Sequence, residues 1–321
     1  MSRATLLPVA ASIEASRVDH LFLALTGIGA AVVGGIVIAL VVFAVRYRAG
    51  NRVDRELTRR HARRIEIIWM TVPFLFFLGF FAWGAVLYVG LHRPPPDALT
   101  INGVGKQWMW KFSHPGGQRE TNELHVPRDR PVRMVLASQD VIHSFYVPAF
   151  RTKQDVVPGY LTTTWFTPTV EGTHHLFCAE YCGTQHSGMI GRIVVLSPGD
   201  YAAWLDEQRP SAPLASEGRA LFDELGCAQC HAYGAAQPGP PLAGLYGSRV
   251  PLTNGTRVIA DDTYLYTAIM NPDAQVRAGY DPIMPSFDGR IDEADTLKLL
   301  AYLRALGHAP RSDATVEQRR P

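Results

Sequence analysis

Two thiols, an imidazole and a thioether fall within one short segment of the chain. Cys178 and Cys182 are four positions apart, and His186 and Met189 follow in the same segment. Sulfur and imidazole ligands together select copper or zinc. A one-copper site needs a single cysteine in such a loop, whereas two thiolates can bridge two copper ions, each of which takes its own imidazole. We predict that His186 supplies one imidazole and that His143, beside an apolar run, supplies the other.

A disulfide or a zinc site would also account for the two cysteines. Disulfides persist outside the reducing cytosol, but one between Cys178 and Cys182 would close a very short loop. It would also leave His186 and Met189 without a role. For His143 the alternative is an ordinary buried histidine. The spacing of the four groups therefore favours a binuclear copper centre.

A second cysteine pair lies in CAQCH, residues 227–231. This is the attachment signature of a c-type haem, with thioether bonds from Cys227 and Cys230 and with His231 as the proximal ligand. A zinc ribbon would need a second Cys or His pair, and only His308 follows in the sequence. The sixth ligand should be Met or His. Met284, in the loop YDPIMP, is favoured over His308 and over Met270, which lies in an apolar helical stretch where a core role is expected.

The elements that carry these groups begin with a membrane anchor. The chain has 321 residues, of which 47% are hydrophobic and only 19% charged, against about 25% charged in a typical globular protein. Residues 21–45 and 67–91 are uncharged, and each run exceeds the ~20 residues that span a bilayer as a helix. We predict transmembrane helices over about 21–45 and 66–91.

Charge sets the orientation of the predicted hairpin. Residues 46–64 hold eight arginines, which places this loop in the cytoplasm and both termini on the outer side. A cleaved secretory signal is the alternative for the first run, but the arginines follow that run rather than precede it. The basic excess sits in residues 1–96, with 11 basic and five acidic residues. A nucleic-acid-binding face therefore has no support.

The outer part of the chain divides into two modules. Short β-prone runs at 101–112, 131–138, 160–166, 173–178 and 189–196 alternate with turn residues and predict a small β-sandwich. A Pro, Ser and Ala-rich stretch, 209–215, precedes helical periodicity at 264–270 and 293–306. We predict an N-terminal segment and hairpin over 1–96, a β domain over 97–210 and an α domain with a C-terminal tail over 211–321.

Several motifs together resemble subunit II of the haem-copper cytochrome c oxidases. They are LHVP at 124–127, SQDVIHSF at 138–145, KQDVVPG at 153–159 and CAEYCGTQHSGM at 178–189. This resemblance covers about residues 65–196, and residues 214–307 resemble a class I cytochrome c. Together they imply a caa-type subunit II. The implied fold is a multidomain membrane protein with a two-helix transmembrane hairpin, an all-β cupredoxin-like sandwich and an all-α class I cytochrome c domain.

The resemblance implies a ligand set for a binuclear copper centre, CuA, and for the haem. His143 and His186 are its terminal imidazoles, Cys178 and Cys182 its bridges, and Met189 and the Glu180 backbone carbonyl its weak axial ligands. The family also uses the carboxylate at the position of Glu180 for a magnesium or manganese ion shared with subunit I, and a solvated acid is the alternative. The turn GPPL, 239–242, is similar to the cytochrome c turn whose proline carbonyl, here that of Pro240, orients the proximal histidine.

Three further positions take a meaning from the resemblance. Trp108 and Trp110 alternate, so we expect both indoles on one face of a strand; in the family electrons enter the copper site here, and a place in the core is the alternative. The family places a glutamate, here Glu66, at the mouth of a proton-uptake channel in subunit I. Snorkelling or pairing with Arg63 is the alternative. Tyr160 stands where the family often has an arginine, so a contact from that arginine to the haem propionates is not carried over.

Two one-electron centres on a membrane hairpin predict an electron relay. The resemblance implies the electron-input subunit of a cytochrome c oxidase, in which electrons pass from haem c through CuA to the haems of subunit I. Oxygen reduction and proton pumping then occur in the partner. The implied partners are subunits I and III, a cytochrome c or another membrane-side donor, and lipid. The expected location is the bacterial inner membrane, with both metal domains periplasmic.

Other classes of protein account for fewer residues. A CuA-type nitric oxide reductase would need the same two centres, and the active-site metal of the partner would distinguish it. A copper-delivery or redox protein of thioredoxin fold gives no reason for Met189, the sandwich or the haem motif. A quinol oxidase subunit II lacks the copper ligands that this chain has.

Overall fold

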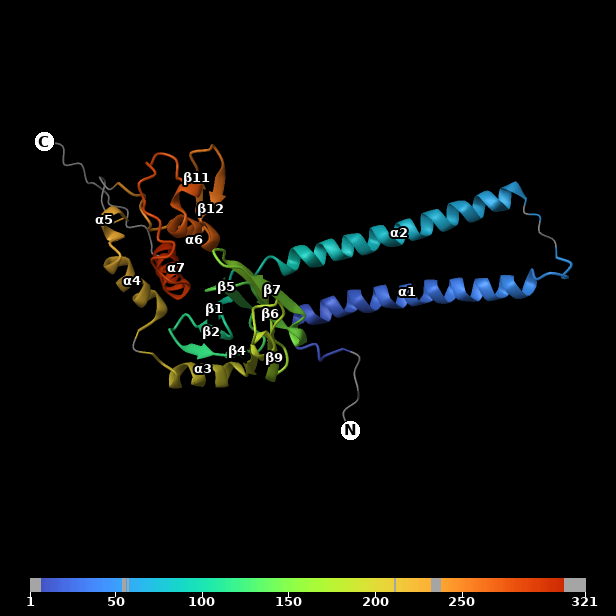
Figure 1. Cartoon of the computed structure of the whole chain (residues 1–321), viewed down its shortest axis with the longest axis horizontal. Coiled ribbons are helices and arrows are strands. Elements are labelled where there is room, and N and C mark those ends of the chain that lie inside the picture. The colour runs from blue at the N-terminus through green and yellow to red at the C-terminus, as the bar shows by residue number, and fades with distance from the viewer. Residues whose placement is uncertain (1–6, 54–55, 57, 211, 232–237, 309–321) are drawn as a thin grey trace.

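The computed structural model describes residues 7–53, 56, 58–210, 212–231 and 238–308. Two long helices, a β-sandwich and a C-terminal helical domain follow one another along the chain (Figure 1). This order confirms the predicted fold class. Of the three ranges predicted as domains, the first and last extend into segments outside the described residues.

Helices α1 (Ile13–Arg46) and α2 (Arg59–Leu91) lie side by side and project away from the sandwich (Figure 1). Both are long and apolar enough to cross a membrane. Each begins before its uncharged run. In α1 the Ser12 side chain accepts a hydrogen bond from the Ala15 amide at 2.9 Å and caps the helix, a role for which serine is preferred. In α2 the first turns carry exposed arginines, so polarity limits the apolar span but not the helix.

The first turns of α1 are attached to the sandwich. Glu14 is buried, and its carboxylate accepts hydrogen bonds from the Thr167 amide at 2.8 Å and the Thr167 hydroxyl at 3.3 Å. One turn later Asp19 accepts two hydrogen bonds from the Arg151 guanidinium, at 2.8 and 2.9 Å. These contacts fix the direction in which α1 leaves the domain.

Ten strands form the sandwich. They are β1 (Leu99–Lys106), β2 (Met109–Ser113), β3 (Arg119–Thr121), β4 (Glu123–Pro127), β5 (Val132–Ser138), β6 (His143–Val147), β7 (Thr152–Val156), β8 (Thr162–Phe166), β9 (Gly172–Cys178) and β10 (Ile190–Leu196). One sheet has the order β3-β2-β1-β5-β8 and the other β4-β10-β9-β6-β7. Between them lies a core of fully buried side chains such as Trp110, Phe145 and Phe166.

The predicted run at 101–112 is an antiparallel hairpin rather than one strand. The chain turns at residues 107–108, and β2 pairs back onto β1, with Lys106 opposite Met109. The expectation that Trp108 and Trp110 share one face of a strand is therefore wrong, because Trp108 lies in the turn and Trp110 in β2. Apolar and aromatic residues continue through this turn, so composition does not mark it.

Helix α3 (Pro198–Glu207) covers one edge of the sandwich. Its Trp204 ring packs on His125 at a centroid distance of 4.7 Å and on His114 at 5.0 Å. Both histidines share the carboxylate of Glu120, at 2.7 Å from His114 Nε2 and 2.5 Å from His125 Nδ1. The helix is thus held by a buried polar cluster.

The helical domain contains α4 (Leu214–Glu224), α5 (Ala228–His231), β11 (Arg249–Pro251), β12 (Arg257–Ile259), α6 (Asp262–Met270) and α7 (Glu293–His308). Of the short 3-10 turns, Pro148–Phe150 and His186–Gly188 belong to the sandwich domain, and Pro272–Gln275 belongs to the helical domain. Helices α4 and α7 cross closely at Gly218, where an added Cβ would lie 2.0 Å from the Lys298 carbonyl oxygen. The stretch expected to separate the domains, 209–215, ends as the first turn of α4.

Candidate functional site

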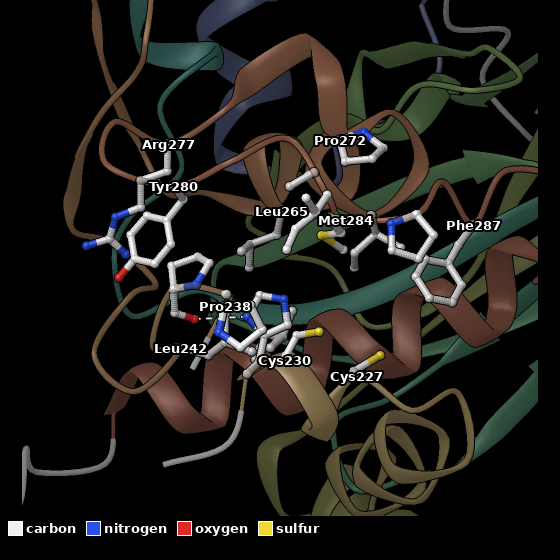
Figure 2. Close-up of a pocket in the computed structure, with 18 of the residues that line it drawn as sticks. Cys227, Cys230, Pro238, Leu242, Leu265, Pro272, Arg277, Tyr280, Met284 and Phe287 are labelled. Atoms are coloured by element: carbon white, nitrogen blue, oxygen red, sulfur yellow. Dashed lines mark hydrogen bonds between the residues drawn. The ribbon is translucent and has the colours of Figure 1, made fainter. Parts of the chain in front are cut away.

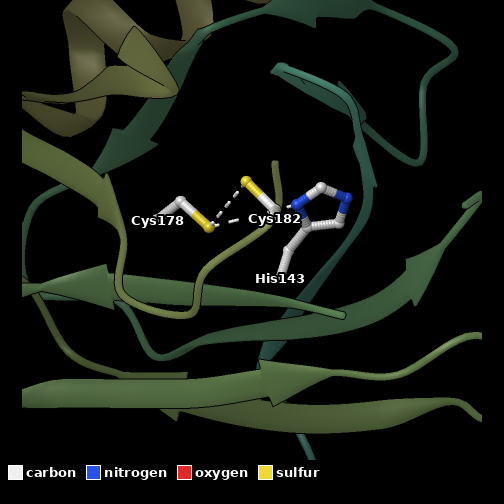
Figure 3. A group of neighbouring side chains, drawn as sticks. All are labelled: His143, Cys178 and Cys182. Atoms are coloured by element: carbon white, nitrogen blue, oxygen red, sulfur yellow. Dashed lines mark hydrogen bonds between the residues drawn. The ribbon is translucent and has the colours of Figure 1, made fainter. Parts of the chain in front are cut away.

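The two cysteines of the β domain lie side by side at one end of the sandwich (Figure 3). Cys178 ends β9, and the following loop carries Cys182 and His186. The two Sγ atoms are 3.8 Å apart. His143, the first residue of β6, places Nδ1 4.0 Å from Cys178 Sγ, and His186 places Nδ1 3.5 Å from Cys182 Sγ. Each thiol therefore has its own imidazole.

These distances distinguish the three interpretations of the cysteine pair, which are a disulfide, a zinc site and a binuclear copper centre. A disulfide bond is about 2.05 Å long, so sulfurs 3.8 Å apart are not bonded, and both cysteines are free. Two thiolates that share a metal at about 2.3 Å lie at most about 4.6 Å apart, which this pair satisfies. The ligand atoms of His143, Cys178 and Cys182 all lie within 4.8 Å of one another, and His186 stands outside this group. Imidazoles beside different sulfurs suit two bridged ions better than one tetrahedral ion.

The two atoms expected as weak axial ligands also reach the pair. The Met189 thioether is buried, with Sδ 3.7 Å from Cys182 Sγ. The Cys178 thiol donates a hydrogen bond to the Glu180 backbone oxygen at 3.2 Å. The side chain of Glu180 is exposed. The structure therefore brings together all six predicted copper-binding groups at one place.

His143 is held by residues that the motifs did not single out. Its Nε2 lies 2.7 Å from Asp140 Oδ1, and Asp140 Oδ2 accepts a hydrogen bond from the Gln107 amide at 2.7 Å. A carboxylate on the second nitrogen fixes the tautomer and ring orientation of a metal-binding histidine. At Gly105 an added Cβ would lie 2.9 Å from His143 Cδ2, so only glycine leaves room for the ring. An aspartate three residues before the histidine was the available signal.

The charges of the two thiols are linked. Burial raises the pKa of the Cys178 thiol, but its interaction with His143 and other hydrogen bonds outweigh burial and lower the pKa to about 6. Burial and the neighbouring Cys178 thiolate raise the pKa of Cys182. One negative charge thus opposes a second on the adjacent sulfur. A bound metal ion removes this conflict because it deprotonates the thiols that coordinate it.

The two tryptophans approach the cluster from different elements. Trp108 donates a hydrogen bond from its indole nitrogen to the Cys182 carbonyl at 3.2 Å, and Gln107 Nε2 donates to the same oxygen at 2.8 Å. Trp110 is fully buried, and its ring meets the His143 ring edge-on at a centroid distance of 6.0 Å. Trp110 thus belongs to the core, while Trp108 is half-buried against the ligand loop.

The helical domain encloses a pocket with largely apolar walls (Figure 2). Cys227 and Cys230 line one side of it, and Met284 lies across from them. Leu265 and Phe287 form part of the wall. An apolar pocket bordered by both cysteines of CAQCH fits a covalently attached haem.

His231, at the end of α5, also lines this pocket. Its Nδ1 lies 2.9 Å from the Pro240 carbonyl oxygen. The neighbouring Gly239 leaves no room for a side chain, because a Cβ there would lie 2.9 Å from His231 Nδ1 and 2.8 Å from the Cys230 carbonyl oxygen. The ring is thus fixed by backbone on one side, and its Nε2 remains as the atom able to bind iron.

Met284 and Met270 occupy different environments. Met284 lines the pocket, whereas Met270 is buried in α6 with its sulfur 4.0 Å from the Thr296 hydroxyl. Among the described residues, neither Met270 nor His308 borders the pocket. The geometry favours Met284 as the sixth ligand.

Glu66 lies on α2 with an exposed side chain, and the described residues show no ion pair between it and Arg63.

Comparison with known proteins identifies a matching family for each of the two domains. The family described as cytochrome c oxidase subunit II, periplasmic domain, matches residues 117–197, and the cytochrome c family matches residues 215–307. Cytochrome c oxidase subunit 2 of Thermostichus vulcanus is 30% identical over 254 residues, which are 62% of this chain and 77% of that protein. The corresponding protein of Alkalihalophilus pseudofirmus is 28% identical over 290 residues, 84% of this chain and 83% of that protein.

Two relatives come from Bradyrhizobium. The alternative cytochrome c oxidase subunit 2 of Bradyrhizobium diazoefficiens is 35% identical over 163 residues, 41% of this chain and 59% of that protein. The solved periplasmic domain of cytochrome oxidase subunit II of Bradyrhizobium japonicum is 32% identical. The match covers 36% of this chain and 96% of the solved chain, with a TM-score of 0.35. With its two predicted membrane helices, its copper-type β domain and its C-terminal cytochrome c domain, the chain belongs to the cytochrome c oxidase subunit II family and is a subunit of an oxidoreductase.

Proposed function

We propose that this chain is the electron-input subunit of a terminal oxidase. One observation carries the proposal: a single chain brings a paired-thiol, paired-imidazole cluster and a CAQCH-bordered pocket together in two domains that pack against each other. Electrons would arrive at the helical domain, continue to the β domain and leave to the haems of subunit I. Oxygen reduction and proton pumping belong to the partner.

The distances in the β domain and the lining of the haem pocket support an assignment of the residues that would hold each group. The binuclear copper centre would use His143, Cys178, Cys182, His186, Met189 and the Glu180 carbonyl. The haem would use Cys227, Cys230, His231 and Met284, with Pro240 orienting His231. When bound, both groups supply one-electron redox chemistry. The protein's own contribution is to exclude water, fix the ligand geometry and set the separation of the two sites.

The charge asymmetry supports an orientation for the whole molecule. The arginine-rich segment between α1 and α2 favours the cytoplasmic side, which puts both metal domains in the periplasm of a bacterium. There Trp108, against the Cys182 carbonyl, is the proposed contact through which electrons enter the copper site, with Trp110 behind it in the core.

Contacts with partners complete the proposal. The exposed Glu180 carboxylate would coordinate magnesium or manganese at the boundary with subunit I, and Glu66 would stand at the mouth of a proton-uptake channel in that subunit. Subunit III, an external cytochrome c or other donor, and membrane lipid are further partners in this proposal.

Metal analysis of the purified full-length chain in its complex tests the proposal. We expect two coppers and one covalent haem per chain, with an EPR signal of the oxidised form spread over both coppers. One copper, zinc or no copper would contradict the relay. A catalytic partner with non-haem iron in place of copper at its active site would instead identify a nitric oxide reductase.

A further inference from the structure

A buried carboxylate joins the helical domain to the sandwich. Asp262, in the first turn of α6, has a side chain only 3% exposed. One of its oxygens lies 2.5 Å from Arg133 Nη2 and the other 2.5 Å from Arg304 Nε. Arg133 belongs to β5 of the sandwich, whereas Arg304 belongs to α7 of the same domain as Asp262. The acid therefore bridges the two domains.

The pair between Asp262 and Arg133 is largely removed from water. Burial raises the pKa of Asp262, but the two guanidinium groups outweigh burial and hold it below its usual range. Removing one partner of a buried ion pair leaves the other charge without compensation, and this is strongly destabilising. In this contact Arg133 donates one hydrogen bond, from Nη2, to one carboxylate oxygen of Asp262.

The surface around Arg133 is covered by the helical domain. Along β5 the side chains of Met134 and Leu136 point into the sandwich core, so those of Val135 and Ala137 point outward. Yet Val135 is 0% exposed and Ala137 is 1% exposed, because they join the apolar cluster of the helical domain. The ion pair thus lies within an apolar interface rather than on its rim.

The same interface brings the helical domain against a strand beside His143. Phe287 and Arg290 line the pocket just before α7 begins. Helix α7 contacts β1 of the sandwich. On β1, Gly105 lies against the ring of His143, where an added Cβ would be 2.9 Å from Cδ2. The docked arrangement therefore brings α7 onto the strand that borders a proposed copper ligand.

Resting on the proposed electron relay, we propose that Asp262 is a positioning residue. Its pairing with Arg133 locks the helical domain onto the outer face of the β1-β5-β8 sheet, so that electrons pass between the two sites in one fixed arrangement. Arg304 holds the carboxylate ready within its own domain. Without the ion pair between Asp262 and Arg133, the helical domain can move about the chain segment that joins it to α3.

The decisive variant is Arg133→Gln in the full-length chain within its complex. This change removes the ion pair between Arg133 and Asp262 but leaves Asp262 paired with Arg304, so the helical domain keeps its own ion pair. Arg192→Gln is the matched control, because Arg192 pairs with Glu123 on the exposed surface of the sandwich. Copper and haem contents are measured first for both variants.

The first readout is the distance distribution between two spin labels, measured by pulsed EPR. The labels are attached through Lys111→Cys on β2 and Arg219→Cys on α4, both exposed positions. We expect a narrow distribution of label distances in the reference, which is the labelled protein without a further change, and in Arg192→Gln. In Arg133→Gln we expect a broad distribution. A distribution that stays narrow in Arg133→Gln overturns the proposal.

The second readout is the rate of electron transfer from photoreduced haem to copper. In the reference we expect a single phase whose rate is independent of viscosity, and in Arg133→Gln a slower rate that depends on viscosity. An unchanged, viscosity-independent rate overturns the proposal. If the reference itself shows no such transfer, the proposed relay fails, and the label distances still decide the role of Asp262.

A conservative variant covers the case in which Arg133→Gln loses metal or haem. Arg133→Lys keeps the charge, but its side chain is one bond shorter, so its ammonium falls short of the position of the Nη2 atom that donates to Asp262. In Arg133→Lys we expect the distances between the two spin labels to be distributed more broadly than in the reference. A distribution as narrow as the reference would overturn the proposal.

Discussion

The copper site and the haem pocket are built in opposite ways. At the proposed copper site the predicted ligand residues lie against one another, with sulfurs 3.8 Å apart and each imidazole within 4.0 Å of a thiol. That arrangement is held by a hydrogen bond from His143 to the Asp140 carboxylate and by hydrogen bonds from Gln107 and Trp108 to the Cys182 carbonyl. In the helical domain, by contrast, the cysteines and Met284 stand on different sides of an apolar pocket.

This difference predicts different consequences of losing each group. The proposed copper ligands sit at one end of a sandwich that has a large core of apolar side chains, so we expect the metal to add function more than fold. The pocket residues form much of the core of the helical domain. We therefore expect the haem to contribute directly to the stability of its domain, since it fills the space between apolar walls.

Removing the haem attachment gives the largest expected effect. The double change Cys227→Ser and Cys230→Ser should abolish covalent haem and lower the unfolding temperature of the helical domain far more than that of the sandwich. Haem staining after denaturing electrophoresis and calorimetry measure both quantities. Met284→Leu is the control, because it leaves both thioether bonds in place. A stable, unchanged helical domain without haem would break the comparison.

Removing a bridging thiol should act on copper alone. Cys182→Ser should reduce copper from two ions per chain to less than one, because both ions share this sulfur. Elemental analysis measures the loss, and the unfolding of the sandwich should change little. Thr184→Ser, an exposed position in the same loop, should keep both ions. Collapse of the sandwich in Cys182→Ser would show that the metal also carries the fold.

Weakening the support of His143 should produce an intermediate effect. In Asp140→Asn the ring loses its carboxylate partner, and we expect copper affinity to fall about 10- to 100-fold. Competition with a chelator measures this change. Asp155→Asn, which loses contacts to Ser144 and Lys153 rather than to a ligand, should retain its affinity. Equal losses in the two variants would contradict a specific role for Asp140.

A polar cluster away from both sites should have the smallest effect. Burial raises the pKa of Glu120, but the hydrogen bonds of His114 and His125 outweigh it and lower the pKa below 4.5. A lowered pKa in the folded state stabilises the fold above the unfolded value and loses that contribution as pH falls through the folded value. Glu120→Gln should therefore cost roughly 1 to 2 kcal/mol at pH 7 and less near pH 3.

Thermal unfolding of the sandwich at both pH values measures this cost. Glu171→Gln is the control, because Glu171 pairs with Arg128 on the exposed surface, where such pairs contribute little. A Glu120→Gln variant with the same loss at both pH values would rule out the ionised carboxylate as the source.

The sequence was sufficient to predict which residues lie together where they are close in the chain. The loop from Cys178 to Met189 and the CAQCH motif each contain most of their predicted ligands in a few residues, and the structure places the distant His143 beside Cys178, as its motif predicted. The charge pattern likewise predicted both membrane helices, although polar capping by Ser12 extends α1 beyond its apolar run.

Contacts between distant segments were not predictable in the same way. Nothing local distinguishes the turn at 107–108 from a continuing strand, so the separate placement of Trp108 and Trp110 was missed. Asp140 and Gln107 act through tertiary proximity to the copper ligands. The pairing of Arg133 with Asp262 joins residues 129 positions apart, and no periodicity in one sequence encodes such a partner.

The attachment of α1 to the sandwich has a consequence for biogenesis. Glu14 meets Thr167 across 153 positions and Asp19 meets Arg151 across 132, so the earliest part of the chain must wait for strands synthesised much later. Such long-range closure is slow. In the proposed topology the segment before α1 must cross the membrane ahead of the β domain that receives it. Translocation of the first helix would then set the earliest moment at which the copper domain can reach its native form.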